Sequence, residues 1–228
     1  MKNNLTIKYF DKIDSTNDYL SDNIKNKNIT TDYLVVAKMQ TNGHGSYDRI
    51  FISDDNGIYF TLGMFCDKNI ETLTPKVAVA IYNSIINLYN IKLDIKWIND
   101  LYYNDKKVAG VLCKYLNEEK CYIIGVGIDL YENKNVTGEY KNIIGYIFDD
   151  KIDENKLVLN IVSEIYNLID KKLPLLYTEN NMILNRKFVY DNNKYIVKYI
   201  NDKGDMVAEN LSNNKNEIFN SSYGIVYE

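Results

Sequence analysis

The apolar pattern of this sequence changes its character near residue 184. Upstream, amphipathic segments alternate with continuous apolar runs; downstream, apolar and polar residues alternate over short segments separated by Asn, Asp and Gly. Alternation with a period of about two residues is typical of half-buried strands. The sequence therefore predicts an α+β domain over residues 1–184, followed by a compact all-β domain of about four or five strands over residues 185–228.

Three segments of the first domain carry helical signals. Residues 73–90 and 154–171 repeat apolar side chains every three or four positions, the spacing of an amphipathic helix. A shorter helix is predicted to begin near Ser15 and Thr16, because short hydroxyl side chains cap free backbone N–H groups. We expect this helix to run to about residue 23.

The remaining apolar segments of the first domain predict a sheet. They are rich in β-branched and aromatic residues, which favour strands. These segments are residues 33–39, 57–65, 93–97, 107–116 and 120–130. The polar, glycine-bearing stretch between the first two predicts a surface loop.

Charge and cysteine content exclude several classes of protein. The 228 residues include 27 basic and 31 acidic side chains, a net charge of −4, whereas a duplex DNA binder needs concentrated positive charge. The three cysteines have no metal-ligand or disulfide spacing, which suits a reducing compartment. No apolar run approaches the ~20 residues of a membrane helix, and the N-terminus lacks a signal-peptide pattern. We therefore expect a cytoplasmic protein without nucleic-acid or membrane partners.

Residues 40–49, QTNGHGSYDR, form the first segment suited to chemistry. Gly43 and Gly45 allow backbone amides to approach an anion, and Arg49 can add a charge-assisted bond to a phosphate. The same residues also suit an ordinary hairpin loop with turn glycines, and the segment alone favours that interpretation. His44 is the only histidine, and we expect a solvated loop side chain there, not a catalyst.

Two further segments are suggestive. In KWINDLYYNDKKVAGVL, two strands joined by a turn bring together Lys96, Asn99, Asp100 and Lys107. The lysines can neutralise a phosphate and Asp100 offers the hard oxygen that Mg²⁺ prefers, although a charged hairpin is the simpler interpretation. In residues 123–129, IIGVGID, two glycines interrupt a buried strand. Either a planar ligand lying across the strand or a β-bulge would account for them, and both remain open.

Taken in order, these segments resemble the biotin protein ligases, also called holocarboxylase synthetases. The resemblance rests on residues 15–17 (STN), 40–45 (QTNGHG), 53 (S), 57–60 (GIYF), 96–100 (KWIND), 106–112 (KKVAGVL) and 125–128 (GVGI). Order and spacing agree over roughly residues 8–130. The resemblance implies a mixed sheet flanked by helices, related to class II aminoacyl-tRNA synthetases and lipoate ligases, with a C-terminal SH3-like β barrel.

The resemblance also implies a reaction in two steps. Biotin attacks the α-phosphate of ATP, with Mg²⁺, to give biotinyl-5′-AMP and pyrophosphate. A lysine of a biotin carboxyl carrier domain, part of a biotin-dependent carboxylase or decarboxylase, then takes the biotinyl group and releases AMP. The implied enzyme is a monomer or a homodimer. Some family members carry an N-terminal DNA-binding domain; the likeness here begins within about the first ten residues, so we expect no repressor role.

Site residues follow from the same resemblance. Those that would bind biotin are Ser15, Thr16, Asn17, Gln40, Gly43, Lys107, Gly110, Leu112, Gly125 and Gly127. Those that would bind ATP are Gly45, Arg49, Phe51, Lys96, Asn99 and Asp129. Catalysis would rest on Lys107, Arg49 and Asp100, with Lys107 spanning the biotin carboxylate and the α-phosphate and Asp100 on the Mg²⁺ side.

The sequence also departs from the family pattern. The usual loop is Gly-Arg-Gly-Arg-x-Gly-Arg-x-Trp, whereas residues 43–51 are GHGSYDRIF, with Asp48 for a glycine and Phe51 for the tryptophan. Asp129 replaces the usual Asn, and Ile98 the usual proline. Each lost charge-assisted bond is worth roughly 1.5–3 kcal/mol, which motivates the hypothesis that biotinyl-AMP is formed but poorly retained. Asp129 is compatible with a second metal ion and with ribose hydroxyls.

Two competing interpretations remain beside the ligase. One is a non-catalytic biotin- or nucleotide-binding relative with a degenerate arginine loop, which the retained Lys107, Asp100, Lys96 and Arg49 disfavour. The other is a ligase for lipoate or octanoate, which the residues matching the family's ureido-binding set, Ser15-Thr16 and Gln40, disfavour.

Overall fold

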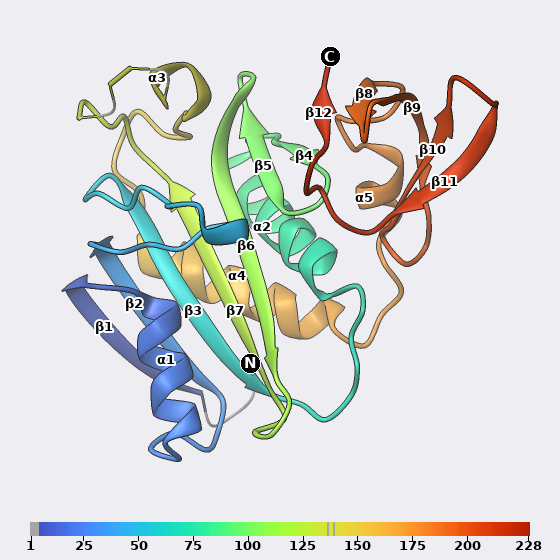
Figure 1. Ribbon diagram of the computed structural model, residues 1–228. Helices are drawn as coiled ribbons and strands as arrows, with labels where there is room; N and C mark the ends of the chain where they lie inside the picture. The colour runs from blue at the N-terminus through green and yellow to red at the C-terminus, as the bar shows by residue number, and fades with distance from the viewer. Residues whose placement is uncertain (1–4, 136, 139) are drawn as a thin grey trace.

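A computed structural model describes residues 5–228, apart from residues 136 and 139 and the side chain of Asp48. Its helices and strands belong to two β-sheets and the helices around them (Figure 1). In chain order they are β1 Thr6–Ile13, α1 Thr16–Lys25, β2 Tyr33–Gln40, β3 Gly57–Phe65, α2 Leu73–Tyr89, β4 Asp94–Lys96, β5 Asp100–Tyr103, β6 Lys106–Leu116, β7 Cys121–Asp129, α3 Tyr140–Ile143, α4 Glu154–Leu168, α5 Leu175–Glu179, β8 Lys187–Tyr190, β9 Asn193–Ile200, β10 Met206–Asn210, β11 Lys215–Phe219 and β12 Val226–Tyr227.

The larger sheet has seven strands in the order β1-β2-β3-β7-β6-β5-β4. β1 runs parallel to β2, and the other neighbours are antiparallel, so the sheet is mixed as predicted. β1 escaped prediction because TIKYFDKI is an edge strand with mostly exposed side chains, so no apolar alternation marks it.

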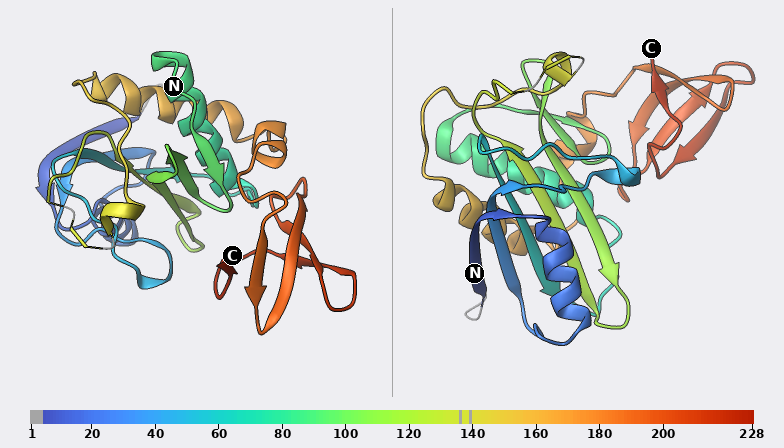
Figure 2. Two further views of the ribbon diagram at one scale, coloured as in Figure 1. Left: turned by 90° about the horizontal axis from the view of Figure 1, so that it is seen from above. Right: turned by 60° about the vertical axis from the view of Figure 1, so that its left-hand side comes forward.

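Side chains alternate between the two faces of this sheet, and each face has its own cover. Ile58, Phe60 and Leu62 of β3 pack with α2 and α4, which lie together on one face (Figure 2, left). α1 lies on the other face, where its Leu20 and Ile24 pack with Val35 of β2. α1 can lie this close to β3 because position 63 is a glycine: a Cβ there would lie 3.0 Å from the Ile24 side chain.

The helices begin where the sequence signals them. The Ser15 hydroxyl accepts a hydrogen bond from the Asp18 amide at 3.2 Å and caps α1. Asp153 caps α4 in the same way, accepting from the Lys156 amide at 2.9 Å. α1 extends to Lys25, two residues beyond its expected end near residue 23. α4 ends at Leu168, three residues before its expected end at residue 171.

The smaller sheet is antiparallel, with five strands in the order β11-β10-β9-β8-β12. Its core is aromatic: the Phe188 and Tyr195 rings stack with centroids 5.1 Å apart, and Phe219 meets both edge-on. The mixed sheet with flanking helices and the all-β C-terminal unit confirm the predicted fold class. The division into domains at residue 184 stays a prediction.

Trp97 joins the two sheets. Its indole Nε1–H donates to the Gly204 carbonyl at 2.8 Å, and its backbone amide donates to the Asn181 side chain at 2.9 Å. The Tyr177 hydroxyl donates to the Ile98 carbonyl at 2.8 Å. These buried bonds place the smaller sheet beside β4, at the edge of the larger one. Among the described residues, none of the helices has the length and apolarity needed to cross a membrane.

We predict that Ile161→Ala, in the fully buried face of α4, lowers the free energy of unfolding by about 2–5 kcal/mol. The loss combines the transfer of apolar atoms with the cavity they leave. Ile218→Ala is the matched control, because that side chain is 68% exposed and its loss should change stability by less than about 0.5 kcal/mol. Urea unfolding followed by circular dichroism measures both, and equal losses would contradict the burial assigned to α4.

Candidate functional site

A cavity of about 350 Å³ opens on the α1 face of the larger sheet. β6 and β7 form its floor, and the segment between β2 and β3 together with α3 forms its walls. The cavity brings together all the predicted site residues except Ser15 and Gly43. Predicted positions as far apart along the chain as Thr16 and Asp129 therefore face one space.

Ser15 and Gly43 lie behind the cavity wall. The Ser15 side chain is only 2% exposed and is used as the cap of α1. Gly43 is buried against the returning strand of the loop, where an added Cβ would overlap the Phe51 carbonyl oxygen and lie 2.6 Å from the Ser53 hydroxyl. Both residues shape the wall, and neither lines the cavity.

A chain of hydrogen bonds closes one end of the cavity. The backbone amide and hydroxyl of Thr16 donate to the Gln40 side-chain oxygen at 2.8 and 2.9 Å. The Gln40 amide group donates to the Ser53 hydroxyl at 3.0 Å. The fully buried Thr61 hydroxyl reaches Thr16 at 2.8 Å and Asn17 at 3.1 Å. Because each group fixes the next, this network holds Asn17 and Gln40 in defined orientations.

Thr61 is a site residue that the sequence analysis missed. Its signal was available, because it is a polar residue inside the apolar run GIYFTLGMF of β3. It shares the cavity face with Gly125, its cross-strand partner on β7. A buried hydroxyl in a strand needs a hydrogen-bond partner, and here the partners are two predicted biotin-binding residues.

The glycines of β6 and β7 make room for side chains. A Cβ at Gly125 would lie 2.5 Å from the Asn17 side chain, and one at Gly127 would lie 2.5 Å from the Phe51 ring. The pairing of β7 with β3 and β6 runs through both positions without a register shift. The β-bulge interpretation is therefore wrong: the planar group that lies against this strand is the ring of Phe51.

The opposite end of the cavity is charged. Lys107 Nζ lies 2.6 Å from Asp100 Oδ1, with the two side chains 27% and 23% exposed. Antiparallel pairing of β5 with β6 produces this contact, so the predicted convergence of the two residues is confirmed. Asn99 donates to the Val111 carbonyl at 2.8 Å and to the Ser46 hydroxyl at 3.3 Å.

The segment between β2 and β3 is a hairpin, the simpler of the two interpretations. Antiparallel bridges join Gln40 to Ser53 and His44 to Ile50. The Gly45 amide donates to the Arg49 carbonyl at 2.7 Å, and Arg49 Nε donates to the Ser46 carbonyl at 2.9 Å. Both potential anion donors therefore face their own loop in this structure. Asp48, which replaces a glycine of the family pattern, has a side chain outside the described part of the structure.

His44 differs from the solvated side chain that we expected. It lines the cavity, and its Nε2 lies 2.6 Å from Asp18 Oδ2, on the first turn of α1. The contact ties the hairpin to the helix that carries Asn17. Nothing in the local sequence indicated this partner, because 26 residues separate the two.

Burial changes the acid–base behaviour of the cavity. Asp129 is only 6% exposed, and burial raises the pKa of its carboxyl group to about 8, with the nearby Lys107 charge acting in the opposite direction. Burial also lowers the pKa of Lys96, partly opposed by Asp100. Asp129 is thus neutral at pH 7 and can donate a hydrogen bond, as the usual Asn at this position can.

The residues present fit a magnesium ion only if substrate phosphates supply most of its ligands. Among the described residues, no group of three or more His, Cys, Asp or Glu side chains is arranged to hold a metal. Asp100 has one carboxylate oxygen on Lys107. A single carboxylate with substrate phosphates and water is a usual way for proteins to hold Mg²⁺, so Asp100 suits that role.

Comparison with known proteins shows the family of this chain. Residues 9–130 match the biotin/lipoate A/B protein ligase family, and the chain belongs to that family. It is 32% identical over 165 residues to the bifunctional ligase/repressor BirA of Bacillus subtilis (strain 168), covering 68% of this chain and 50% of that protein. It is 26% identical over 126 residues to biotin–protein ligase 2 of Arabidopsis thaliana, covering 52% and 38%. The chain thus spans half or less of the length of these relatives.

Solved structures show the same fold. The biotin protein ligase from Aquifex aeolicus in complex with biotin and ATP superposes with a TM-score of 0.80 at 21% identity, over 98% of each chain. The biotin protein ligase from Leishmania major in complex with biotinyl-5-AMP gives a TM-score of 0.63 at 16% identity, over 97% of this chain and 100% of that one. At these identities the likeness shows the fold alone.

We predict that Asp129 makes stability depend on pH. Its folded pKa of about 8 lies above the ordinary value of 3.8, so the folded state retains a proton that the unfolded chain releases. Stability should therefore be full at acid pH, fall as pH rises between about 4 and 8, and level off above that. Relative to the isosteric Asp129→Asn, the loss should approach ~1.4 kcal/mol per pH unit. Urea unfolding at a series of pH values measures the free energy of unfolding of both proteins. If the two free energies changed with pH in parallel, the burial of the Asp129 carboxyl group would be contradicted.

Proposed function

We propose that this chain is an ATP-dependent biotin protein ligase. It forms biotinyl-5′-AMP from biotin and MgATP and transfers the biotinyl group to a lysine of a biotin carboxyl carrier domain. The observation that carries the proposal is the division of one cavity into a hydrogen-bonded end, built on Thr16 and Gln40, and a cationic end, built on Lys107. Family membership supports the same activity.

The hydrogen-bonded end suits the ureido ring of biotin. Asn17 and Gln40 offer both donors and acceptors at the cavity wall, held by Thr16, Thr61 and Ser53. A buried polar group left without a partner costs about 1–3 kcal/mol, so such a wall discriminates against ligands that lack the ureido group. This favours biotin over lipoate or octanoate, which present no ureido group.

The cationic end suits the first chemical step. A biotin carboxylate oxygen attacks the α-phosphorus of ATP, a P–O bond forms, and the bond to the bridging oxygen breaks to release pyrophosphate. Two anions must approach, and Lys107 is placed by Asp100 at 2.6 Å to neutralise the charge between them. Lys96, Asn99 and Arg49 line the same end and would contact the polyphosphate. Mg²⁺, held by Asp100 with the phosphates, would further reduce their repulsion.

The second step needs an acceptor amine at the mixed anhydride. The neutral ε-amine of the acceptor lysine attacks the biotinyl carbonyl carbon, the amide bond forms, and AMP leaves with the electrons of the C–O bond. Tyr140 and Ile143 of α3 and Ile50 of the hairpin border the cavity and are exposed, so the acceptor would enter between them. Whether the enzyme acts as a monomer or a homodimer stays a prediction.

A non-catalytic relative is the second candidate. The altered hairpin favours it, because His44 and Ser46 stand where arginines are usual and Arg49 faces its own loop. The Lys107–Asp100 pair favours the enzyme, since a partly exposed ion pair adds little stability and a binding protein has no need to keep it.

We predict that the wild-type protein catalyses biotin-dependent exchange of labelled pyrophosphate into ATP with Mg²⁺. Lys107→Ala should lower the exchange rate by roughly 10²-fold or more, because it removes a preorganised cation from the reacting groups. Lys106→Ala is the matched control. The Lys106 side chain is exposed and donates a hydrogen bond to the Lys141 carbonyl, so exchange should persist in this variant.

The outcomes of this assay are distinct. Exchange that survives Lys107→Ala would contradict the role of that lysine. A wild-type protein that binds biotin in calorimetry without any exchange would support the non-catalytic relative. Binding of lipoate in preference to biotin would support the lipoate-type ligase and overturn the role given to Asn17 and Gln40.

We predict that Ser46→Arg slows the escape of biotinyl-AMP by about tenfold, because a restored charge-assisted bond is worth roughly 1.5–3 kcal/mol. Ser46 lines the cavity, next to Asn99 at 3.3 Å, so a longer side chain reaches the cationic end. Ser46→Gln is the neutral control. Trapping the released adenylate with an added amine measures escape, and equal escape from both variants would remove the hairpin as its cause.

A further inference from the structure

Among the described residues, Lys96 has no counter-ion at the end of the cavity where we place the phosphates. Its Nζ lies 5.2 Å from the centroid of the Tyr102 ring and 5.3 Å from that of Tyr227, and it donates to the Tyr102 hydroxyl at 3.3 Å. Within the part of the chain that the structure describes, no carboxylate forms an ion pair with it. The two rings therefore hold Lys96 in place.

This arrangement differs physically from that of Lys107. The Asp100 carboxylate orients Lys107 and at the same time neutralises it. An aromatic face attracts a cation through its quadrupole and leaves the full charge available to another anion. A lysine ammonium is otherwise poorly positioned, because the four-carbon stem of the side chain is flexible. Two rings around Lys96 thus supply orientation without loss of charge.

The electrostatic surroundings agree with this difference. Burial lowers the pKa of Lys96, and the charges of Arg186, Lys107 and Arg49 lower it further, against the opposing effect of Asp100. A lysine that other cations repel is stabilised when an anion with several charges enters. Lys96 lines the cavity where we place the polyphosphate.

Tyr227 comes from the smaller sheet, at the opposite end of the sequence. β12 pairs with β8, with Tyr227 opposite Phe188, and Figure 1 shows this last strand near β4, the edge strand of the larger sheet. Its hydroxyl is buried and has no hydrogen-bond partner in the part of the chain that the structure describes. The contact with Lys96 is therefore made by the ring, and the hydroxyl does not account for it.

We propose that Tyr227 is a positioning residue that holds the Lys96 ammonium toward the phosphates of ATP. The inference rests on the proposed function, and it assigns part of the nucleotide site to the C-terminal sheet. Tyr227 touches no reacting group; it acts through Lys96. The aromatic face carries this role, so Phe should replace Tyr at this position and an aliphatic residue should not.

Biotin-dependent pyrophosphate exchange tests the proposal in the full chain. Tyr227→Leu should raise the KM for MgATP roughly tenfold while the KM for biotin stays unchanged, and Tyr227→Phe should retain wild-type values. Lys96→Met combined with Tyr227→Leu should be no worse than Lys96→Met alone, because both changes remove one interaction. Tyr199→Leu, a 51% exposed tyrosine of the same sheet, controls for the loss of a tyrosine.

Several results would overturn the inference. An unchanged KM for MgATP in Tyr227→Leu, or losses that add in the double variant, would show that the ring does not act through Lys96. Equal damage from Tyr227→Phe would show that the hydroxyl carries the role. A parallel rise in the KM for biotin would indicate a general structural effect.

A second measurement separates this inference from the proposed function. Reductive methylation with ¹³C keeps the charge of lysines, and the Lys96 methyl resonance, assigned with Lys96→Met, should show a ring-current shift. Tyr227→Leu should reduce that shift and Tyr227→Phe should keep it. If the wild type shows no exchange, the proposed function fails, and the Lys96 resonance alone tests whether Tyr227 positions Lys96. A ring-current shift that stays unchanged in Tyr227→Leu would overturn that positioning role. A shift that is reduced in Tyr227→Leu would support it.

Discussion

Bare backbone in the middle of the larger sheet is the constraint on which the cavity depends. Gly110 on β6 lies opposite Gly127 on β7, and Gly125 follows on the same face. Side chains at these positions would collide with Phe51 and Asn17, as close as 2.5 Å. The glycines lower the strand propensity of β6 and β7, a cost that the long, regular pairing with β3 offsets. In return, α1 and the hairpin lie close to the sheet and enclose the cavity above these glycines.

Charge is distributed over this floor in three different ways. Lys107 is paired with Asp100, Lys96 is held by aromatic rings, and Asp129 is buried deeply enough to stay protonated at neutral pH. The cavity consequently presents positive charge and hydrogen-bond donors to a ligand, because Asp129 in its protonated form adds no negative charge. A site of this kind favours an anion and tolerates the close approach of two anions, which is what adenylate formation requires.

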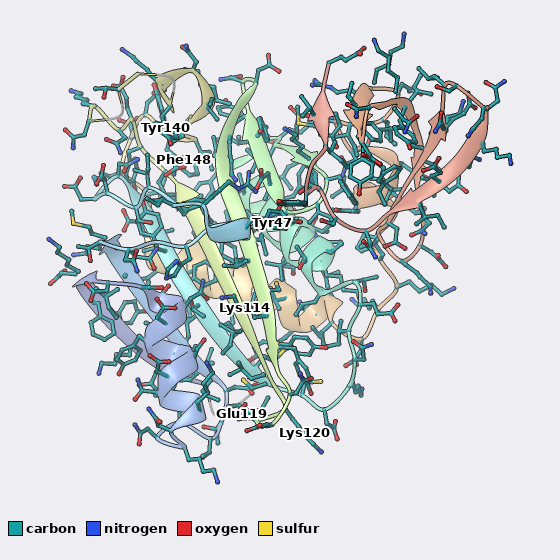
Figure 3. The ribbon with its side chains drawn as sticks, viewed as in Figure 1. Tyr47, Lys114, Glu119, Lys120, Tyr140 and Phe148 are labelled. Carbon is teal, nitrogen blue, oxygen red and sulfur yellow. The ribbon has the colours of Figure 1, made fainter. Side chains whose placement is uncertain are left out.

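The altered hairpin contacts the C-terminal part of the chain. The Tyr47 hydroxyl lies 2.6 Å from the Ser221 hydroxyl, and its ring centroid lies 5.2 Å from that of Tyr223. Figure 3 labels Tyr47 at the end of the hairpin nearer the smaller sheet. Tyr47 adopts a φ of 58°, a left-handed conformation that costs a non-glycine residue some strain. The hairpin tip therefore contacts the loop between β11 and β12. Together with the contacts of Trp97 and Tyr227, this contact links the smaller sheet to segments near the cavity.

Local patterns determined much of this protein in advance. The periods of residues 73–90 and 154–171, the cap at Ser15 and the apolar strands follow from burial within each segment, and the ordered motifs identified the family. The tertiary structure alone decided the contacts between segments. Edge strand β1 has no apolar pattern, Thr61 gains its meaning from Thr16, and Tyr227 reaches Lys96 across 131 positions of the chain. A sequence pattern records how deeply a residue is buried, whereas the register of a sheet and the packing of its loops choose the neighbour, and that choice depends on the whole fold.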